Sequence, residues 1–245
     1  VLNSALEQAV KAQTIQRNPA KYAKLPSVRV KAIHPLSPAE IVAFVDAAQD
    51  SAYYAPLMCC LFLGLREGEA LGLSWTHIDF ENGKATICQQ LQKDKSKGGQ
   101  FYIQQGTKNG QSRVLDIPDF LLEILAEEKH RQLCARLAAG PAWCNAWGLC
   151  FTDALGRPIS YHTLWANCKR IAASIGLPEL RVHDLRHTNA TLALVNGDDL
   201  KTVQANLGHA TAAFTLQRYV HASEEMKRAS ANRMQQFFVD NVKKA

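Results

Sequence analysis

The segment "VHDLRHTNATL", residues 182–192, places two histidines and an arginine at helical spacing. On a helix His183, Arg186 and His187 share one face, because positions i, i+3 and i+4 are neighbours. Three interpretations fit: a metal site, a phosphate site, or an ordinary polar face of a helix. The histidine spacing is that of the H-E-x-x-H zinc enzymes, but Asp184 stands where their glutamate base would be. An arginine on the same face would also repel a dication, so the choice depends on the rest of the chain.

The residues around this segment predict a mainly helical domain. In "LSPAEIVAFVDAAQ", Ser37 can cap a helix, Pro38 fits its first turn and Glu40 completes a capping box. The next segment, "YYAPLMCCLFLG", is apolar nearly all round, which predicts a core helix that ends at Gly64. A further helix is predicted over about 119–138, another from about His183 to Asn196, and another that ends before Gly208. Ser160 can cap one more helix, whose apolar face is formed by Leu164, Trp165, Cys168, Ile171 and Ile175.

The middle of the chain changes from a helical to a strand period. Residues 85–92, 100–105 and 113–118 predict three short strands joined by the basic turns "KDKSKGG" and "GTKNGQS". We expect them to form one small antiparallel meander, and residues 148–152, "GLCFT", to add a further short strand. The expected fold class is therefore mainly α with a small antiparallel β-sheet, an α+β fold.

Composition narrows the class of partner. The formal charge of +6 favours a polyanionic partner, although such an excess is also common in ordinary soluble proteins. Seven cysteines without a C-x-x-C pair indicate small buried apolar residues in a reducing compartment rather than a zinc cage. No segment of the sequence approaches a membrane span or reads as a signal peptide. We expect a cytoplasmic protein with no membrane partner.

Three other segments carry side chains that can bind or attack a phosphate, each beside an expected turn or helix end. They are "LGLREGEALGLSW" (63–75) with Arg66 just beyond the buried helix, "GTKNGQSR" (106–113) with Lys108 at the tip of a strand hairpin, and "NLGHATAAFTLQRYVH" (206–221) with His209 after a helix-ending glycine and Tyr219 ten residues on.

Each of these residues also has an ordinary explanation. Arg66 could pair with Glu67 or Glu69 on the surface, and lysines in polar turns such as Lys108 are usually only solvated. A histidine at a helix end can bond local carbonyls, and a tyrosine can be a half-buried core aromatic. These explanations would all have to hold together, in the order in which the four segments occur.

That order is Arg, Lys, His-x-x-Arg, His and Tyr, and it resembles the catalytic signature of the tyrosine recombinases, the phage and conjugative-transposon integrase family. The resemblance covers about residues 35–235. It implies the tyrosine recombinase/integrase catalytic-domain fold. It also implies a site-specific DNA recombinase that cleaves and rejoins strands through a covalent 3′-phosphotyrosyl intermediate, without ATP, cofactor or metal. The implied catalytic residues are Arg66, Lys108, His183, Arg186, His209 and Tyr219.

The chemistry of phosphodiester cleavage suits these residue types. Attack builds charge on the nonbridging oxygens, and the planar guanidinium groups of Arg66 and Arg186 offer paired donors that match them. The phenol of Tyr219, with an ordinary pKa near ~10, must lose its proton as it attacks. His183 is the natural acceptor, and His209 can hydrogen-bond the same phosphate. "HDLRH" is thus interpreted as half of a phosphate site, with His187 supporting the fold.

The departing 5′ oxygen needs a proton, which a lysine can deliver. The resemblance assigns this role to Lys108, because "TKNGQSR" is similar to the lysine-bearing turn of the family. Lys93, Lys95 and Lys97 in the preceding turn are the alternatives, and they more readily suit contacts to backbone phosphate or solvent.

The resemblance also predicts domains and partners. Residues 1–34 are expected to be the last helix of a preceding core-binding domain plus a linker, and residues 35–245 the catalytic domain. A tail helix at about 224–245 resembles those that dock on a neighbouring protomer, although packing on its own domain is equally compatible. The expected partners are double-stranded DNA attachment sites and further copies of the protein, as a tetramer on DNA and a monomer when free. We expect a bacterial or phage origin.

Two other functions remain open at this point. A type IB topoisomerase shares the chemistry but would relax DNA without two specific sites. A DNA-binding relic that no longer cuts would keep the fold and the charge, although all six expected positions are filled.

Overall fold

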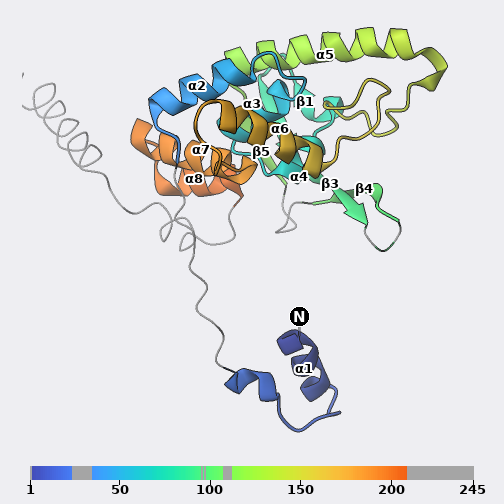
Figure 1. Ribbon diagram of the computed structural model, residues 1–245, viewed down its shortest axis with the longest axis vertical. Helices are drawn as coiled ribbons and strands as arrows, with labels where there is room; N and C mark the ends of the chain where they lie inside the picture. Colours follow the sequence, from blue (N-terminus) through green and yellow to red (C-terminus); the bar gives the residue numbers. More distant parts are fainter. Residues whose placement is uncertain (1, 24–34, 95, 97, 107–111, 209–245) are drawn as a thin grey trace, which may run out of the picture. The chain divides into compact units, whose positions relative to one another are not determined.

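Two compact units, Val1–Ala32 and Ile33–Ala245, make up the chain in a computed structural model. The structure describes residues 2–23, 35–94, 96, 98–106 and 112–208, which are the coloured parts of Figure 1.

The first unit consists of helix α1 (Leu2–Lys11) and the 3-10 helix η1 (Pro19–Tyr22). Asn18 joins the two, because its side chain accepts from Ala20 N and donates to Asn3 Oδ1 and Glu7 Oε1. The helix expected within residues 1–34 thus ends at Lys11. No residue of α1 is fully buried in the described structure.

The second unit is mainly helical, as predicted. Its helices are α2 (Pro38–Ala48), α3 (Tyr54–Phe62), α4 (Glu67–Leu71), α5 (Asp119–Ala139), α6 (Tyr161–Ser174), α7 (Val182–Asn196) and α8 (Leu200–Leu207), with the 3-10 helices η2 (Trp75–His77) and η3 (Gly140–Ala142). The sequence did not predict α4 or the 3-10 helices, which are too short to show a period.

The predicted capping box at the start of α2 is confirmed. Ser37 Oγ accepts from the backbone of Glu40, whose carboxylate accepts from Ser37 N at 2.7 Å. Ile41, Phe44 and Ala48 are buried on one face, as their spacing predicted. The sequence therefore sets both where this helix begins and which side it buries.

Helix α3 is the core of the unit. Seven of its nine residues are buried, and it packs against α7 and α5 (Figure 1). Gly64 follows in the left-handed conformation (φ 61°), where a glycine carries no Cβ penalty. The chain changes direction at Gly64 and continues into Leu65 and Arg66. The end of α3 therefore determines where Arg66, the first predicted site residue, lies.

The predicted single meander is wrong, because the strands form two sheets. In one sheet β2 (Lys84–Ile87) lies between β1 (Ile78–Asp79) and β5 (Arg113–Asp116); in the other, β3 (Gln89–Asp94) pairs with β4 (Gln100–Gln105). The expected strand 85–92 is interrupted at Cys88.

The interruption has a physical cause in the packing of β3 on α4. Gln89 and Gln90 are buried, and Gln89 Nε2 donates to the carbonyl of Gly72 at 2.7 Å. Buried polar side chains need such partners, so β3 follows the end of α4 instead of continuing the first sheet. Since β4 and β5 belong to different sheets, the hairpin expected around Lys108 is also wrong.

Two smaller predictions are wrong for related reasons. Residues 148–152 form only isolated bridges, because Gln132 of α5 reaches the carbonyls of Leu149 and Cys150 and satisfies them. Trp165 is 38% exposed, so it lies beside the buried face of α6 rather than on it.

The cysteine prediction holds for four of the seven thiols. Cys59, Cys60, Cys150 and Cys168 are buried, and burial raises the pKa of Cys59 to about 12. Cys134 and Cys144 are exposed, contrary to the expectation.

In the described part of the chain, no helix has the length and apolar character needed to cross a membrane.

Gly72→Ala is expected to destabilise the second unit by about 1–3 kcal/mol, the usual cost of overpacking. An added Cβ would lie 2.6 Å from Leu91 N and 2.8 Å from the backbone of Gln90, and backbone atoms cannot move aside cheaply. Urea unfolding measures the loss. Gly68→Ala on the same helix is the matched control, because its nearest contact is 3.3 Å, and equal midpoints for the two variants would contradict the packing argument.

Candidate active site

Arg66 stands at the N-terminus of α4, directly after the turn that ends α3. Its guanidinium donates from Nη1 to Glu69 Oε1 at 2.6 Å and from Nη2 to the carbonyl of Gly208 at 3.2 Å. The pairing with Glu69 is the ordinary alternative anticipated from the sequence, but Glu69 is buried rather than on the surface. The side chain of Arg66 is 21% exposed, and its described contacts use two of its five N–H groups. Arg66 can therefore offer donors at the surface while Glu69 holds it in place.

Arg186 lies beneath the surface, with an exposed fraction of 2%. Nη1 donates to the carbonyl of Gly64 at 2.6 Å, and Nη2 donates to the carbonyl of Leu207 at 2.5 Å. These carbonyls belong to the ends of α3 and α8, where helices leave unpaired acceptors and partial negative charge. Arg186 thus joins two helix ends.

Arg113 on β5 is a third arginine in the same place, and the sequence did not single it out. Nη2 donates to Glu69 Oε2 at 2.7 Å, Nη1 donates to Glu69 Oε1 at 3.2 Å, and Nε donates to the carbonyl of Asn206 at 2.7 Å. We call Arg66, Arg113, Arg186 and Glu69 the arginine cluster.

Glu69 is the anion at the centre of the arginine cluster. Burial alone would raise the pKa of its carboxyl, but the hydrogen bonds and charges of Arg113 and Arg66 outweigh burial and lower the pKa to about 2. Arg186 Nη1 lies 3.8 Å from Glu69 Oε2. Three cations thus surround one carboxylate, which leaves an excess of positive charge at these helix ends.

The sequence contains a signal for Glu69, although Glu69 was not among the predicted site residues. It follows Arg66 by three positions, the spacing of a capping box, and its carboxylate does accept from Arg66 N at 3.0 Å. No pattern in the sequence indicated Arg113, because its partners lie 44 and 93 residues away.

His183 lies near the start of α7 and is exposed to solvent. Partial burial lowers the pKa of His183, and the neighbouring charge of Arg186 lowers it further. A lowered pKa favours the neutral imidazole, which is the form that accepts a proton. His187 is buried, and its ring packs edge-on against His183 with centroids 4.6 Å apart, which suits a supporting role.

Asp184, which stands where a zinc enzyme would have its glutamate, is part of the scaffold. Its carboxylate accepts from the backbone of Arg181 at 2.9 Å and from the guanidinium of Arg181 at 2.7 Å. Among the described residues, no group of three or more His, Cys, Asp or Glu side chains is placed to hold a metal ion.

Three of the predicted site residues, Lys108, His209 and Tyr219, lie outside the described residues, as do Lys95 and Lys97. Among the predicted site residues, the structure brings together Arg66 and Arg186, with His183 on the same helix as Arg186. Lys93 lies elsewhere, on β3, with Nζ 5.3 Å from the centroid of the Phe101 ring.

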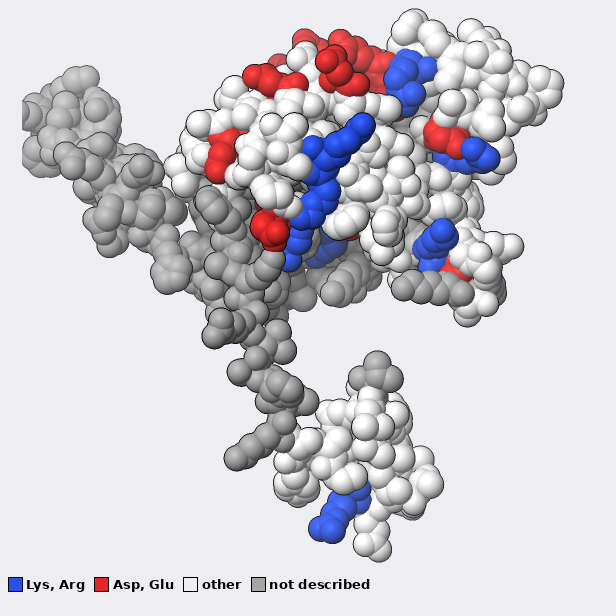
Figure 2. Space-filling view, in the orientation of Figure 1, with Lys and Arg blue, Asp and Glu red and all other residues white. Residues whose placement is uncertain are grey.

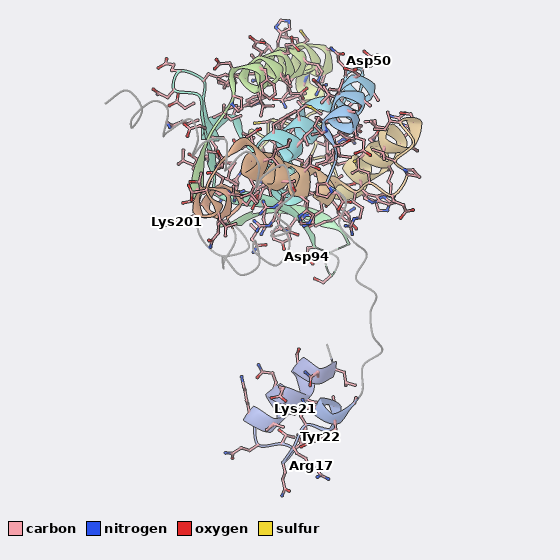
Figure 3. The ribbon with its side chains drawn as sticks, turned by 90° about the vertical axis from the view of Figure 1, so that its left-hand side faces the viewer. Arg17, Lys21, Tyr22, Asp50, Asp94 and Lys201 are labelled. Carbon is pink, nitrogen blue, oxygen red and sulfur yellow. The ribbon has the colours of Figure 1, made fainter. Side chains whose placement is uncertain are left out.

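The surface of the second unit is divided by charge. On the face shown in Figure 2, acidic side chains gather along the upper edge, where α2 and α5 lie, and a band of Lys and Arg runs below them over α6. In the side view of Figure 3, Lys201 of α8 and Asp94 at the end of β3 lie on the side opposite to Asp50, which follows α2. Lys201 of α8 therefore points away from the side of the unit on which Asp50 lies.

The second unit is a mainly helical domain in which three arginines meet at the ends of helices, so it belongs to the class of proteins that can bind an anionic group there. Comparison with known proteins identifies the family to which the chain belongs. The chain belongs to the phage integrase family, whose model matches residues 35–226.

Curated relatives agree with this assignment. The chain is 32% identical over 215 residues to a tyrosine recombinase XerC-like protein of Caldanaerobacter subterraneus subsp. tengcongensis, covering 84% of this chain and 55% of the relative. It is 25% identical to an integrase of Saccharopolyspora erythraea, covering 96% of this chain and 64% of the relative. The chain thus spans between about half and two thirds of the length of these relatives.

Solved structures share the fold. The Tn1549 transposon integrase in complex with a circular intermediate DNA matches with a TM-score of 0.76 at 23% identity, covering 94% of this chain and 76% of the other. The XerH site-specific recombinase bound to a palindromic difH substrate matches with a TM-score of 0.59 at 24% identity, covering 84% of this chain and 54% of the other. The expected tyrosine recombinase catalytic-domain fold is confirmed.

Proposed function

We propose that this chain is the catalytic part of a site-specific DNA recombinase, an integrase that cleaves and rejoins strands through a 3′-phosphotyrosyl bond to Tyr219. The observation that carries the proposal is the arginine cluster, which sets Arg66 and Arg186 against the carbonyl end of α8. His209 of the family signature is the next residue after Gly208 in the sequence. The names of the relatives support the same function.

The two arginines have different parts in charge stabilisation. Arg66, at the surface, supplies donors to the nonbridging oxygens as negative charge develops there. Arg186, at 2% exposure, contributes its charge from beneath and fixes the two helix ends. Both arginines are thus proposed to stabilise the charge of the phosphate, Arg66 at the surface and Arg186 from beneath it.

The covalent step balances within the protein and the DNA. The phenol oxygen of Tyr219 bonds to phosphorus as the bond to the 5′ oxygen breaks; His183 takes the phenol proton, and Lys108 gives one to the 5′ oxygen. His209 hydrogen-bonds the phosphate. Because one phosphodiester replaces another, religation needs no ATP.

The partners follow from this function. The net charge of +6 and the relatives solved with DNA support double-stranded DNA attachment sites as the substrate. Exchange between two sites needs several active sites, so the protein acts as a tetramer on DNA and is a monomer when free. Residues 1–34 are the end of a preceding DNA-binding domain with its linker, residues 35–245 form the catalytic domain, and a tail helix at about 224–245 docks on a neighbouring protomer. The protein acts in the cytoplasm of a bacterium.

A nicked suicide duplex carrying a recombination junction of the source genome tests the proposal. The short fragment downstream of the cut diffuses away, so the protein is expected to remain attached to the 3′ end and to form a slow band on a denaturing gel. Mass spectrometry of the band should locate the nucleotide on Tyr219. Relaxation of plasmid DNA that lacks the junction, with no preference for the site, would instead indicate a topoisomerase.

Cleavage is expected to persist in EDTA, and DNA binding is expected to weaken steeply with salt. Arginines rather than a cation carry the phosphate charge, and each neutralised phosphate releases counterions, so that log K falls with a slope of roughly −0.9 per contact. The first measurement is the adduct yield in EDTA. The second is the DNA affinity from about 50 to 200 mM salt, the range over which such proteins lose most of their affinity. Activity lost in EDTA and restored by zinc or magnesium would overturn the metal-free mechanism.

A further inference from the structure

We propose that Arg113 is a positioning residue for this reaction: it fixes Arg66 through Glu69, and it fixes the end of α8 through Asn206. The inference rests on the proposed function for its catalytic consequence, but the placement of Arg66 by Arg113 can be measured without any DNA. Arg113 is not among the residues that the family signature supplied here.

Strand β5 directs Arg113 into the unit. Side chains of a strand alternate between its two faces, and Leu115, two positions on, is buried, whereas Val114 and Asp116 are exposed. The side chain of Arg113 is 10% exposed. A long cation on the core face of a strand needs a buried anion, and Glu69 supplies it.

The two arginines share both oxygens of that anion. Oε1 accepts from Arg66 Nη1 at 2.6 Å and from Arg113 Nη1 at 3.2 Å; Oε2 accepts from Arg66 N at 3.0 Å and from Arg113 Nη2 at 2.7 Å. The fork of Arg113 therefore determines the rotation of the carboxylate, and the carboxylate determines where Arg66 Nη1 lies.

Removing Arg113 changes the charge of Glu69 as well as its orientation. Burial raises the pKa of this carboxyl, and Arg113 is the largest of the opposing influences. Without it, the carboxylate has less to hold it ionised and in place, and Arg66 is left with a weaker anchor.

The same side chain also fixes the last turn of α8. Three consecutive carbonyls there accept from three different arginines: Asn206 from Arg113 Nε, Leu207 from Arg186 Nη2 and Gly208 from Arg66 Nη2. A Cβ on Gly208 would lie 3.1 Å from Arg113 Nη1, so the fit is close. His209 comes next in the sequence, so the backbone position of Gly208, to which it is joined, is set by Arg113 together with Arg66 and Arg186.

The test compares Arg113→Gln and Arg113→Lys with the wild type. Arg113→Gln is expected to slow cleavage at saturating DNA by about 10²-fold, the size of effect seen when a charge-stabilising donor is lost or misplaced. The Kd for DNA should change less than about threefold, since a single buried residue adds no phosphate contact. Arg113→Lys restores the charge without the two-pronged geometry, so it should recover only part of the rate.

Lys84→Gln is the matched control. Lys84 of β2 pairs with Asp116 of β5 at 2.7 Å, but this pair is exposed and lies three residue pairs along the sheet from Arg113. Its rate should equal that of the wild type. An equal defect in Lys84→Gln would show that disturbing β5, rather than losing the fork of Arg113, causes the change.

A methylphosphonate at the scissile position separates positioning from general damage. A methyl group in place of one nonbridging oxygen removes the negative charge that Arg66 stabilises, so the defects of Arg66→Ala and Arg113→Gln should both shrink to about tenfold or less. A defect of Arg113→Gln that stays the same on both substrates would mean that Arg113 only supports the fold.

The guanidinium signals of Arg66 in a ¹⁵N NMR spectrum test the placement without DNA. A resolved Arg66 signal in the wild type should broaden or exchange faster with water in Arg113→Gln, and should be unchanged in Lys84→Gln. An unaltered Arg66 signal in Arg113→Gln overturns the inference, whether or not the protein cuts DNA. If the Arg66 signal changes in Arg113→Gln but the wild-type protein forms no adduct with DNA, the placement of Arg66 by Arg113 stands and the proposed function is overturned.

Discussion

Tyr219→Phe is expected to abolish the covalent protein–DNA adduct while DNA affinity and the unfolding midpoint stay unchanged. Phenylalanine keeps the aromatic ring and lacks only the oxygen that attacks phosphorus. A denaturing gel with the nicked suicide duplex measures the adduct, and a filter or fluorescence titration measures affinity. No other reaction step can compensate, because the nucleophile itself is gone.

Tyr161→Phe is the matched control, since Tyr161 is 53% exposed on α6 and plays no part in the proposed reaction. It should form the adduct at the wild-type rate. An adduct of undiminished yield from Tyr219→Phe would move the nucleophile to another residue and refute the assignment.

Glu69→Gln is expected to reduce the free energy of unfolding by about 3–5 kcal/mol at pH 7, the usual result of removing one partner from a buried ion pair. The amide keeps the shape of the side chain, but Arg66, Arg113 and Arg186 then lie close together without their shared anion. Urea unfolding measures the loss. Glu67→Gln on the same helix is the control: burial raises the pKa of Glu67, so removing its charge should cost little.

The difference between the wild type and Glu69→Gln should depend on pH in a defined direction. The folded pKa of Glu69 is about 2, below its ordinary value of 4.5, so its ionised form stabilises the folded state. This contribution is complete above pH 4.5 and is lost as the pH falls from there through 2. Unfolding midpoints that stay equally far apart at pH 7 and pH 2.5 would contradict the buried ion pair.

Local signals predicted the helices well. The capping box of Ser37 and Glu40, the apolar segment of α3 and the glycines at 64, 197 and 208 gave helix positions that the structure confirms. Each of these signals acts within a few residues, so the sequence alone contains it.

Strand pairing and the arginine cluster depend on distant residues instead. β2 pairs with β5 as well as with β1, and not with β3, the next strand in the sequence, because β3 is held at the end of α4 by Gln89 and the close approach of Gly72. Arg113 becomes part of the site only because that pairing brings it to Glu69. A resemblance that supplies six catalytic positions does not supply these contacts. The roles of Lys108, His209 and Tyr219 remain predictions.

The arginine cluster also has a consequence for protein synthesis. Arg66 must reach a carbonyl that lies 142 residues later in the chain, and Arg113 must reach one that lies 93 residues later. Contacts of such long sequence separation form late in folding, and a nascent chain on the ribosome cannot form them before residue 208 has left the exit tunnel. An unfinished or prematurely terminated chain therefore has the first catalytic arginine but no assembled site. Any chemistry that needs the arginine cluster is thus delayed during translation until the chain has been made beyond residue 208.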